Sequence, residues 1–201
     1  MDALLSFAAA LVSLRLAGAL ATRWRSRRAP ALGAWAAALA AYALAAAALA
    51  WGAAAGWDDR AFRAYYLFGG LVTAPLLGAG SLLLVGRRWA APVALLYAGL
   101  AVGVAVTMQI APHVRGDDLP SAGDHLAFVP ARLVAVLANS VGTAAVVGVA
   151  LWTWRRRRVG NTLVLAGVGA AAAGTGIAPG TAWTAAAIAV GAVLLYMGFV
   201  A

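Results

Sequence analysis

Three reactive residue types are missing from this sequence. The chain of 201 residues contains no cysteine, no lysine and no glutamate. Disulfide bonds, thiolate nucleophiles, lysine Schiff bases and glutamate general acids are therefore excluded. Charge of either sign is also scarce, because charged residues make up only 10% of the chain, against about a quarter in soluble domains. So few groups remain for catalysis that we expect a protein that is not an enzyme.

Hydrophobic residues, in contrast, make up 65% of the chain. They form blocks of about 20 residues between short basic or Gly/Pro-rich segments, and a helix of about 20 residues crosses the roughly 30 Å of bilayer hydrocarbon. The blocks are rich in Ala and Leu and show no sustained alternation, which favours helices over strands. We predict an all-α integral membrane protein in which residues 1–201 form a single transmembrane domain.

The blocks predict seven transmembrane helices. Their approximate ranges are 3–22, 31–52, 62–85, 90–111, 131–153, 161–177 and 181–200. The eight Trp residues fall near the ends of these ranges, as expected for the aromatic belts of a membrane protein. Between the last two ranges, Pro179 and Gly180 predict a tight hairpin on the outer side.

The basic residues predict the orientation, because short Arg-rich loops stay in the cytoplasm. They cluster after the first, third and fifth predicted spans, at Arg23, Arg25, Arg27, Arg28, Arg87, Arg88, Arg155, Arg156, Arg157 and Arg158. The six acidic residues, all Asp, fall on the opposite side. We therefore predict an outside N-terminus, a cytoplasmic C-terminus and a multi-pass protein of the cytoplasmic (inner) membrane. The cytoplasmic arginines would attract anionic lipid headgroups, and no aromatic-interleaved basic patch predicts nucleic-acid binding.

Arg15 is unusual because it lies inside the first predicted span, and an intramembrane Arg costs a few kcal/mol. Two readings are open for this residue. Its long side chain reaches the inner headgroups, or it faces the bundle interior and binds helix carbonyls or an anionic ligand group.

The remaining polar side chains gather in the outer half of the third, fourth and fifth spans. The candidate ligand-binding residues there are Arg63, Tyr65, Tyr66, Thr73, Gln109, Asn139 and Thr143. Asn139 and Thr143 are four residues apart and share a helix face, while Pro75 is expected to kink the third span and create room. These groups either line an outward-facing cavity or only join helices by hydrogen bonds.

The outer loop 112–130 contains His113, His125 and three Asp residues. Their spacing matches no metal motif, so we expect a solvated acidic loop without metal or cofactor.

Gly99 and Gly103 of the fourth predicted span form a GxxxG pair. Such a pair serves either tight packing within the chain or a dimer face.

The layout resembles several seven-helix families. Retinal proteins need a Lys in the last span and ceramidase-like hydrolases need three zinc-binding histidines, and this chain has no Lys and two His. The layout is also similar to SWEET-type carriers, which contain two three-helix repeats. The first and fifth spans would be equivalent helices of these repeats, since they run into residues 24–28 (WRSRR) and 154–158 (WRRRR). The Pro-Gln pair of that family is absent. Residues 63–70 (RAYYLFGG) and 77–81 (LGAGS) resemble a family of uncharacterised small polytopic membrane proteins of GC-rich bacteria, and that resemblance implies no activity.

Two functions fit these observations. The first is a small-molecule carrier or ligand-binding receptor with an outward-facing polar site. The second is a non-catalytic accessory or scaffold subunit of a membrane complex, in which the polar groups only pack. A small-molecule ligand, a second copy of the chain and another protein are the candidate partners.

Overall fold

The computed structural model describes residues 2–176 and 181–201, and this part of the chain is helical with no β-strand beyond isolated bridges. The all-α prediction is therefore confirmed. The elements are α1 (Asp2–Arg27), α2 (Pro30–Ala55), α3 (Asp59–Tyr65), the π-helical η1 (Tyr66–Val72), α4 (Thr73–Leu84), α5 (Ala90–Thr107), α6 (Ala122–His125), the π-helical η2 (Phe128–Arg132), α7 (Leu133–Trp152), α8 (Arg158–Gly176) and α9 (Thr181–Val200). The predicted hairpin at Pro179 and Gly180 lies outside the described residues.

Six helical segments are long and apolar enough to cross a membrane. They are Asp2–Arg27, Pro30–Ala55, Asp59–Leu84, Ala90–Thr107, Phe128–Trp152 and Ala182–Val200. The third joins α3, η1 and α4 into one rod, and the fifth joins η2 and α7. The chain is thus a helical protein with the character of a membrane protein, and α8, which matches the sixth predicted span, is not among these six segments.

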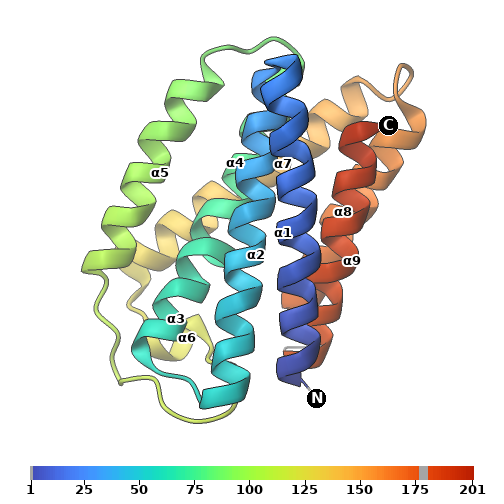
Figure 1. Ribbon diagram of the computed structural model, residues 1–201. Helices are drawn as coiled ribbons and strands as arrows, with labels where there is room; N and C mark the ends of the chain where they lie inside the picture. Colours follow the sequence, from blue (N-terminus) through green and yellow to red (C-terminus); the bar gives the residue numbers. More distant parts are fainter. Residues whose placement is uncertain (1, 177–180) are drawn as a thin grey trace.

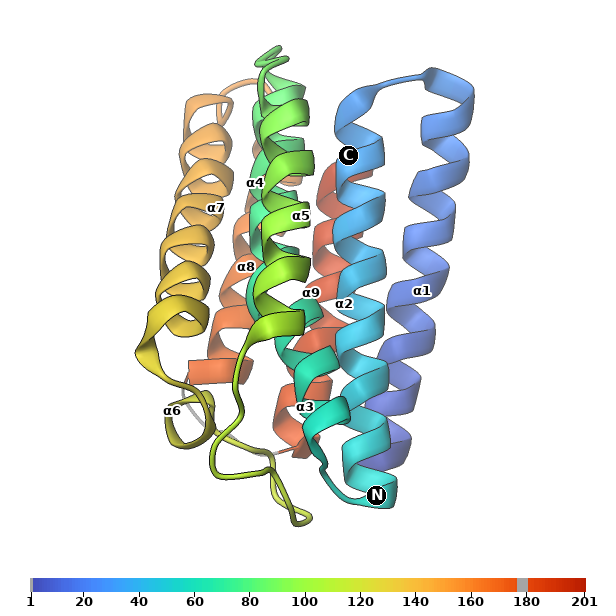
Figure 2. The ribbon, with the colours of Figure 1, turned by 90° about the vertical axis from the view of Figure 1, so that its left-hand side faces the viewer.

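The helices form one elongated bundle with the described chain ends at opposite ends of it (Figure 1). Helix α1 packs against α2 and α9, α2 packs against α4, and α4 packs against α7. Helix α8 packs mainly against α9. Helix α5 stands at the left edge of the bundle in Figure 1 and in front of α4 in Figure 2, and it packs against α4 and η1.

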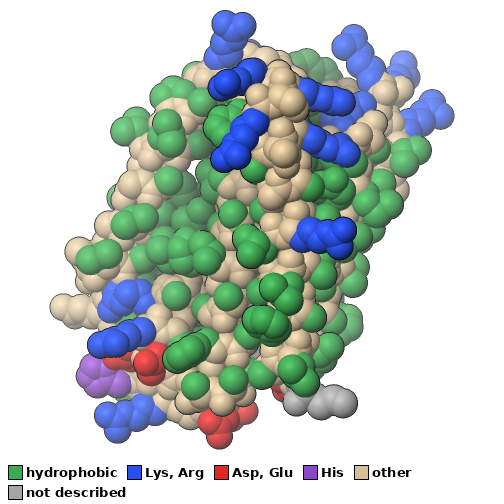
Figure 3. Space-filling model, viewed as in Figure 1, with side chains coloured by type: hydrophobic (Ala, Val, Ile, Leu, Met, Phe, Trp, Pro, Cys, Tyr) green, Lys and Arg blue, Asp and Glu red, His purple; other side chains and the backbone are tan. Residues whose placement is uncertain are grey.

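The two ends of the bundle differ in the charges of their side chains. Arginines gather at the end formed by the last turn of α1 and the α4–α5 and α7–α8 turns, which we call the arginine-rich end (Figure 3). The Asp and His side chains visible in the same view lie at the opposite, acidic end. The acidic end also holds arginines, such as Arg60 and Arg115 beside Asp58 and Asp59, whereas the turns of the arginine-rich end contain no Asp.

Glycines allow two pairs of helices to touch through their backbones. A Cβ atom on Gly78 of α4 would lie 2.7 Å from the carbonyl oxygen of Gly142 of α7. In the α8–α9 pair, a Cβ on Gly198 would lie 2.7 Å from the carbonyl oxygen of Gly160. Such contacts exclude every side chain larger than hydrogen, and they bring helices close enough for dispersion forces to hold them together in lipid.

The GxxxG pair on α5 does not take part in packing within the described bundle. A Cβ atom on Gly99 or on Gly103 would meet no described atom within 4 Å. The pair lies on an exposed face of α5, so it does not provide tight packing within the chain.

The aromatic-belt prediction fails for two of the eight tryptophans. Trp35 and Trp57 are each only 3% exposed. Trp35 stacks on Phe199 with ring centroids 4.1 Å apart, and its ring fills the space left by Gly80 of α4. Their positions near span ends are typical of belt residues, but their partners on other helices make them core residues.

Candidate functional site

A cavity of about 290 Å³, which we call the central cavity, lies between the helices and opens on the bundle surface where Thr143 and Ala172 are exposed. Its walls come from α2, η1, α4, α7, α8 and α9, and most of them are Ala, Val and Leu side chains. Four side chains bring polar groups to this cavity, namely Tyr42, Thr73, Asn139 and Thr143. Tyr42 lies near the middle of α2 and Asn139 in the first half of α7, so the cavity lies between the two ends of the bundle.

The irregular wall of the cavity follows from Pro75. Proline has no N–H, so the carbonyls four and five residues before it lose the donor that a helix supplies. The kink expected at Pro75 takes the form of the π-helical segment η1, a feature common at functional sites. One freed carbonyl, that of Leu71, accepts a hydrogen bond of 2.8 Å from the Tyr97 hydroxyl of α5.

The second freed carbonyl, that of Gly70, and the carbonyl of Phe68 in the same segment bind side chains that face the cavity. Asn139 Nδ2 of α7 donates to the carbonyl oxygen of Gly70 at 2.7 Å. Thr73 Oγ1 donates to the carbonyl oxygen of Phe68 at 2.6 Å. These bonds fix the rotamers of Asn139 and Thr73, so the polar groups of the cavity are held in place before any ligand arrives.

One polar atom at the cavity is buried and has no hydrogen-bond partner in the described part of the chain. This atom is Asn139 Oδ1, because the amide nitrogen of the same side chain is the atom that binds Gly70. Tyr42 is only 9% exposed and lines the same cavity. An unpaired buried polar group costs about 1–3 kcal/mol, so a ligand that pairs with Asn139 Oδ1 would recover that free energy.

The structure brings together some of the residues predicted from sequence. Thr73, Asn139 and Thr143 line the central cavity. Tyr66 is buried and donates from its hydroxyl to the carbonyl oxygen of Ala131 at 3.2 Å. Tyr65 packs edge-on against Trp57, with ring centroids 5.6 Å apart. Both tyrosines thus stabilise the acidic end of the bundle rather than line the cavity.

Arg63, Gln109 and Arg15 lie away from the central cavity. The Arg63 guanidinium donates to the carbonyl oxygens of Ala105, Val106 and Met108, and so caps the end of α5. Helix α5 ends at Thr107 rather than at residue 111 because Met108 adopts an extended backbone. Gln109 follows that end and is exposed.

Arg15 lies on the exposed face of α1. The buried face of this helix carries small residues, among them Ser6, Ser13 and Ala17. Arg15 points away from that face and makes no ion pair with a described residue. Arg15 therefore does not face the interior of the described bundle.

The outer loop folds onto the acidic end through its apolar residues, while its three Asp side chains remain exposed as expected for a solvated acidic loop. Met108, Ile110, Val114 and Leu126 are all buried in the core. Asp59 holds the loop, since its carboxylate accepts the backbone N–H of Val114 at 2.8 Å and lies 2.6 Å from His113 Nδ1. Within residues 2–176 and 181–201, no three His, Cys, Asp or Glu side chains gather in a way that could hold a metal.

Sequence reasoning missed Tyr42. It is the only polar side chain between Trp35 and Trp51 in a segment composed mainly of Ala and Leu, and that isolation is a signal that could have identified it. A second missed residue is Asn161, which is 5% exposed. Its amide donates to the carbonyl oxygen of Ala150 at 2.9 Å and joins the start of α8 to the end of α7.

Comparison with known proteins gives no family for this chain. No family model matches it, and neither the curated proteins nor the solved structures contain a significant match. The arguments about function therefore rest on the cavity and its residues.

Proposed function

We propose that the protein is a small-molecule carrier or ligand-binding receptor, and that its site is the central cavity. The observation that carries this proposal is one buried and unpartnered polar atom, Asn139 Oδ1, in a cavity with mostly apolar walls that Tyr42 also lines. Ligand sites are usually apolar pockets with a few fixed polar groups. The proposed site uses α2, α8 and α9 as well as the third and fifth predicted spans, and it does without the fourth.

The cavity walls define the class of solute. No charged side chain lines the cavity, and an unpaired ion in such surroundings would lose its hydration without compensation. The solute is therefore uncharged and largely apolar. It donates one hydrogen bond to Asn139 Oδ1.

We further propose that α8 is a seventh span, with the N-terminus outside and the C-terminus in the cytoplasm of a cell whose cytoplasmic membrane holds the protein. The separation of arginines from acidic residues supports this orientation. Single cysteines at Ser26 and Asp118 test it cleanly, since the chain has no cysteine of its own. An impermeant maleimide added to whole cells should label Asp118→Cys and spare Ser26→Cys. The reverse pattern would contradict the orientation.

Native mass spectrometry tests the proposed site. The protein, extracted from its own membrane in mild detergent, should retain one small molecule in fixed ratio. Val168→Phe fills the cavity and should abolish retention, while Val190→Phe places the same bulk on an exposed face of α9 and should retain the molecule. Asn139→Leu should weaken retention as well. A wild-type protein without a bound molecule, or equal retention by both Phe variants, would refute the proposal.

A second candidate function is the accessory or scaffold subunit. It is favoured by the use of most interior polar side chains, including Tyr66, Tyr97 and Asn161, as donors to helix carbonyls. In that case Asn139→Leu would lower stability only, and a polypeptide would co-purify with an otherwise empty protein.

A further inference from the structure

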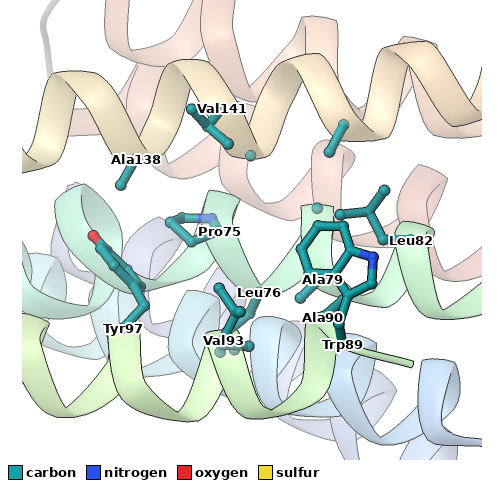
Figure 4. Close-up of a pocket in the computed structure, with 14 residues that line it drawn as sticks. Pro75, Leu76, Ala79, Leu82, Trp89, Ala90, Val93, Tyr97, Ala138 and Val141 are labelled. Atoms are coloured by element: carbon teal, nitrogen blue, oxygen red, sulfur yellow. The ribbon is translucent and has the colours of Figure 1, made fainter. Parts of the chain in front are cut away.

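A second cavity of about 190 Å³ lies at the side of the bundle, between α4, α5 and α7. Figure 4 shows Pro75 and Leu76 of α4, Val93 and Tyr97 of α5 and Val141 of α7 around it. Val93 and Val141 are 52% and 69% exposed, so the cavity is a groove that opens on the surface of the bundle. It is distinct from the central cavity, which lies on the other side of α4.

Small residues leave this groove unfilled. Ala79 and Ala138 line it where larger side chains would close it, and Gly78 and Gly142 form the contact between α4 and α7 beside it. Helix α5 packs on α4 and η1, and the hydrogen bond from Tyr97 to Leu71 holds it there at 2.8 Å. The groove is therefore a fixed feature between three helices.

The walls of the groove are hydrocarbon. Only two of its side chains carry a polar atom, and of these the Tyr97 hydroxyl is already used and the Trp89 indole lies at the arginine-rich end. A bound water needs two to four polar partners, whereas an apolar cavity of about 150 Å³ takes a benzene molecule. On a lipid-facing surface, the matching occupant is an acyl chain.

The arginine-rich end of the groove is positively charged. Arg87 and Arg88 directly precede Trp89, both are exposed, and neither forms an ion pair with any carboxylate of the described residues. A guanidinium binds phosphate through two parallel hydrogen bonds. Tryptophan favours the headgroup level of a bilayer, so Trp89 places the two arginines where a phosphate would lie.

We propose that this groove binds one anionic phospholipid, with an acyl chain between α5 and α7 and the phosphate on Arg87 and Arg88. The apolar walls fix the chain, and the two cations select an acidic headgroup. This site is specific, in contrast to the diffuse attraction between anionic headgroups and any cluster of arginines.

The experiment adds phosphatidylglycerol or phosphatidylcholine to the delipidated full-length protein and counts bound lipids by native mass spectrometry. One phosphatidylglycerol should bind more tightly than phosphatidylcholine. Arg87→Gln with Arg88→Gln should weaken it roughly 10- to 30-fold, from about 1 kcal/mol per arginine. The control is Arg155→Gln with Arg156→Gln, which removes the same charge from another exposed turn. Equal binding of both lipids, or equal loss in both double variants, would overturn the proposal.

A second pair of variants tests the groove itself. Ala138→Phe fills it, whereas Leu137→Phe alters the adjacent residue, which is 57% exposed. Ala138→Phe should prevent phosphatidylglycerol binding with every arginine intact, and Leu137→Phe should not. Binding that survives Ala138→Phe in a folded protein would show that the chain lies elsewhere. Val168→Phe, which fills the central cavity, should leave this lipid bound and so separates the two proposed sites.

Discussion

Substitution of Gly142 by Ala should destabilise the protein through a single backbone contact. The new Cβ atom would lie 2.5 Å from the carbonyl oxygen of Ala74 and 2.8 Å from the nitrogen of Pro75. These are backbone atoms of α4, so the clash is relieved only if α4 and α7 move apart. Overpacking of this kind costs about 1–3 kcal/mol.

A matched variant on the same helix removes the effect of helix propensity. Replacement of Gly by Ala stabilises a helix by about 1 kcal/mol, and Gly148→Ala should show this gain alone because its Cβ would meet nothing within 4 Å. The propensity gain cancels between the two variants, so their difference measures the contact at Gly142. We expect Gly142→Ala to be less stable than Gly148→Ala by about 1–3 kcal/mol.

The assay is reversible unfolding in mixed micelles, with sodium dodecyl sulfate as denaturant and circular dichroism as readout. The midpoint for Gly142→Ala should lie below that for Gly148→Ala, with similar slopes. Equal midpoints would refute the reasoning, because they would mean that α4 and α7 do not touch at this position.

Three further predictions concern helix ends and freed carbonyls. Arg63→Gln should uncap α5 and cost about 1–2 kcal/mol, seen as faster amide exchange in its last turn, and unchanged exchange would contradict the cap. Tyr97→Phe leaves the carbonyl of Leu71 without its donor and should lower the unfolding free energy by about 0.6 kcal/mol; a midpoint equal to that of the wild type would argue against this bond. Arg157 donates to the carbonyl oxygen of Gly198 at 3.0 Å and so caps the end of α9. Arg157→Gln should therefore speed the trimming of α9 by carboxypeptidase, while Arg156→Gln should not. Equal trimming of the two variants would exclude this cap.

Most of the fold could be predicted from the hydropathy and the charge pattern of the sequence. Blocks of about 20 apolar residues were enough to predict the helices, because a bilayer accepts few other structures. The bounds were less accurate where a helix end depends on a distant residue. Helix α5 ends at Thr107, next to carbonyls that Arg63 binds from another helix, and no local pattern encodes that partner.

The candidate site was predicted in part for a similar reason. The four-residue spacing of Asn139 and Thr143 placed both on one face, and both line the central cavity. Tyr42 could not be predicted from the same pattern, because it stands alone in α2 while the other polar residues cluster in spans three to five. Which helices surround a cavity depends on their order in the bundle, and the periodicity of a single span does not contain that order.

The π-helical segment η1 has a consequence for changes in chain length. A π-type turn accommodates an extra residue, and one residue of α-helix corresponds to a rotation of about 100°. Deletion of one residue within Tyr66–Val72 would turn the π-type segment toward a regular α-helix and leave the register between α3 and α4 almost unchanged. Deletion of Thr73 or Ala74, in the regular helix that follows, would instead turn α3 by that angle relative to the rest of α4, and Arg63 would face away from the end of α5.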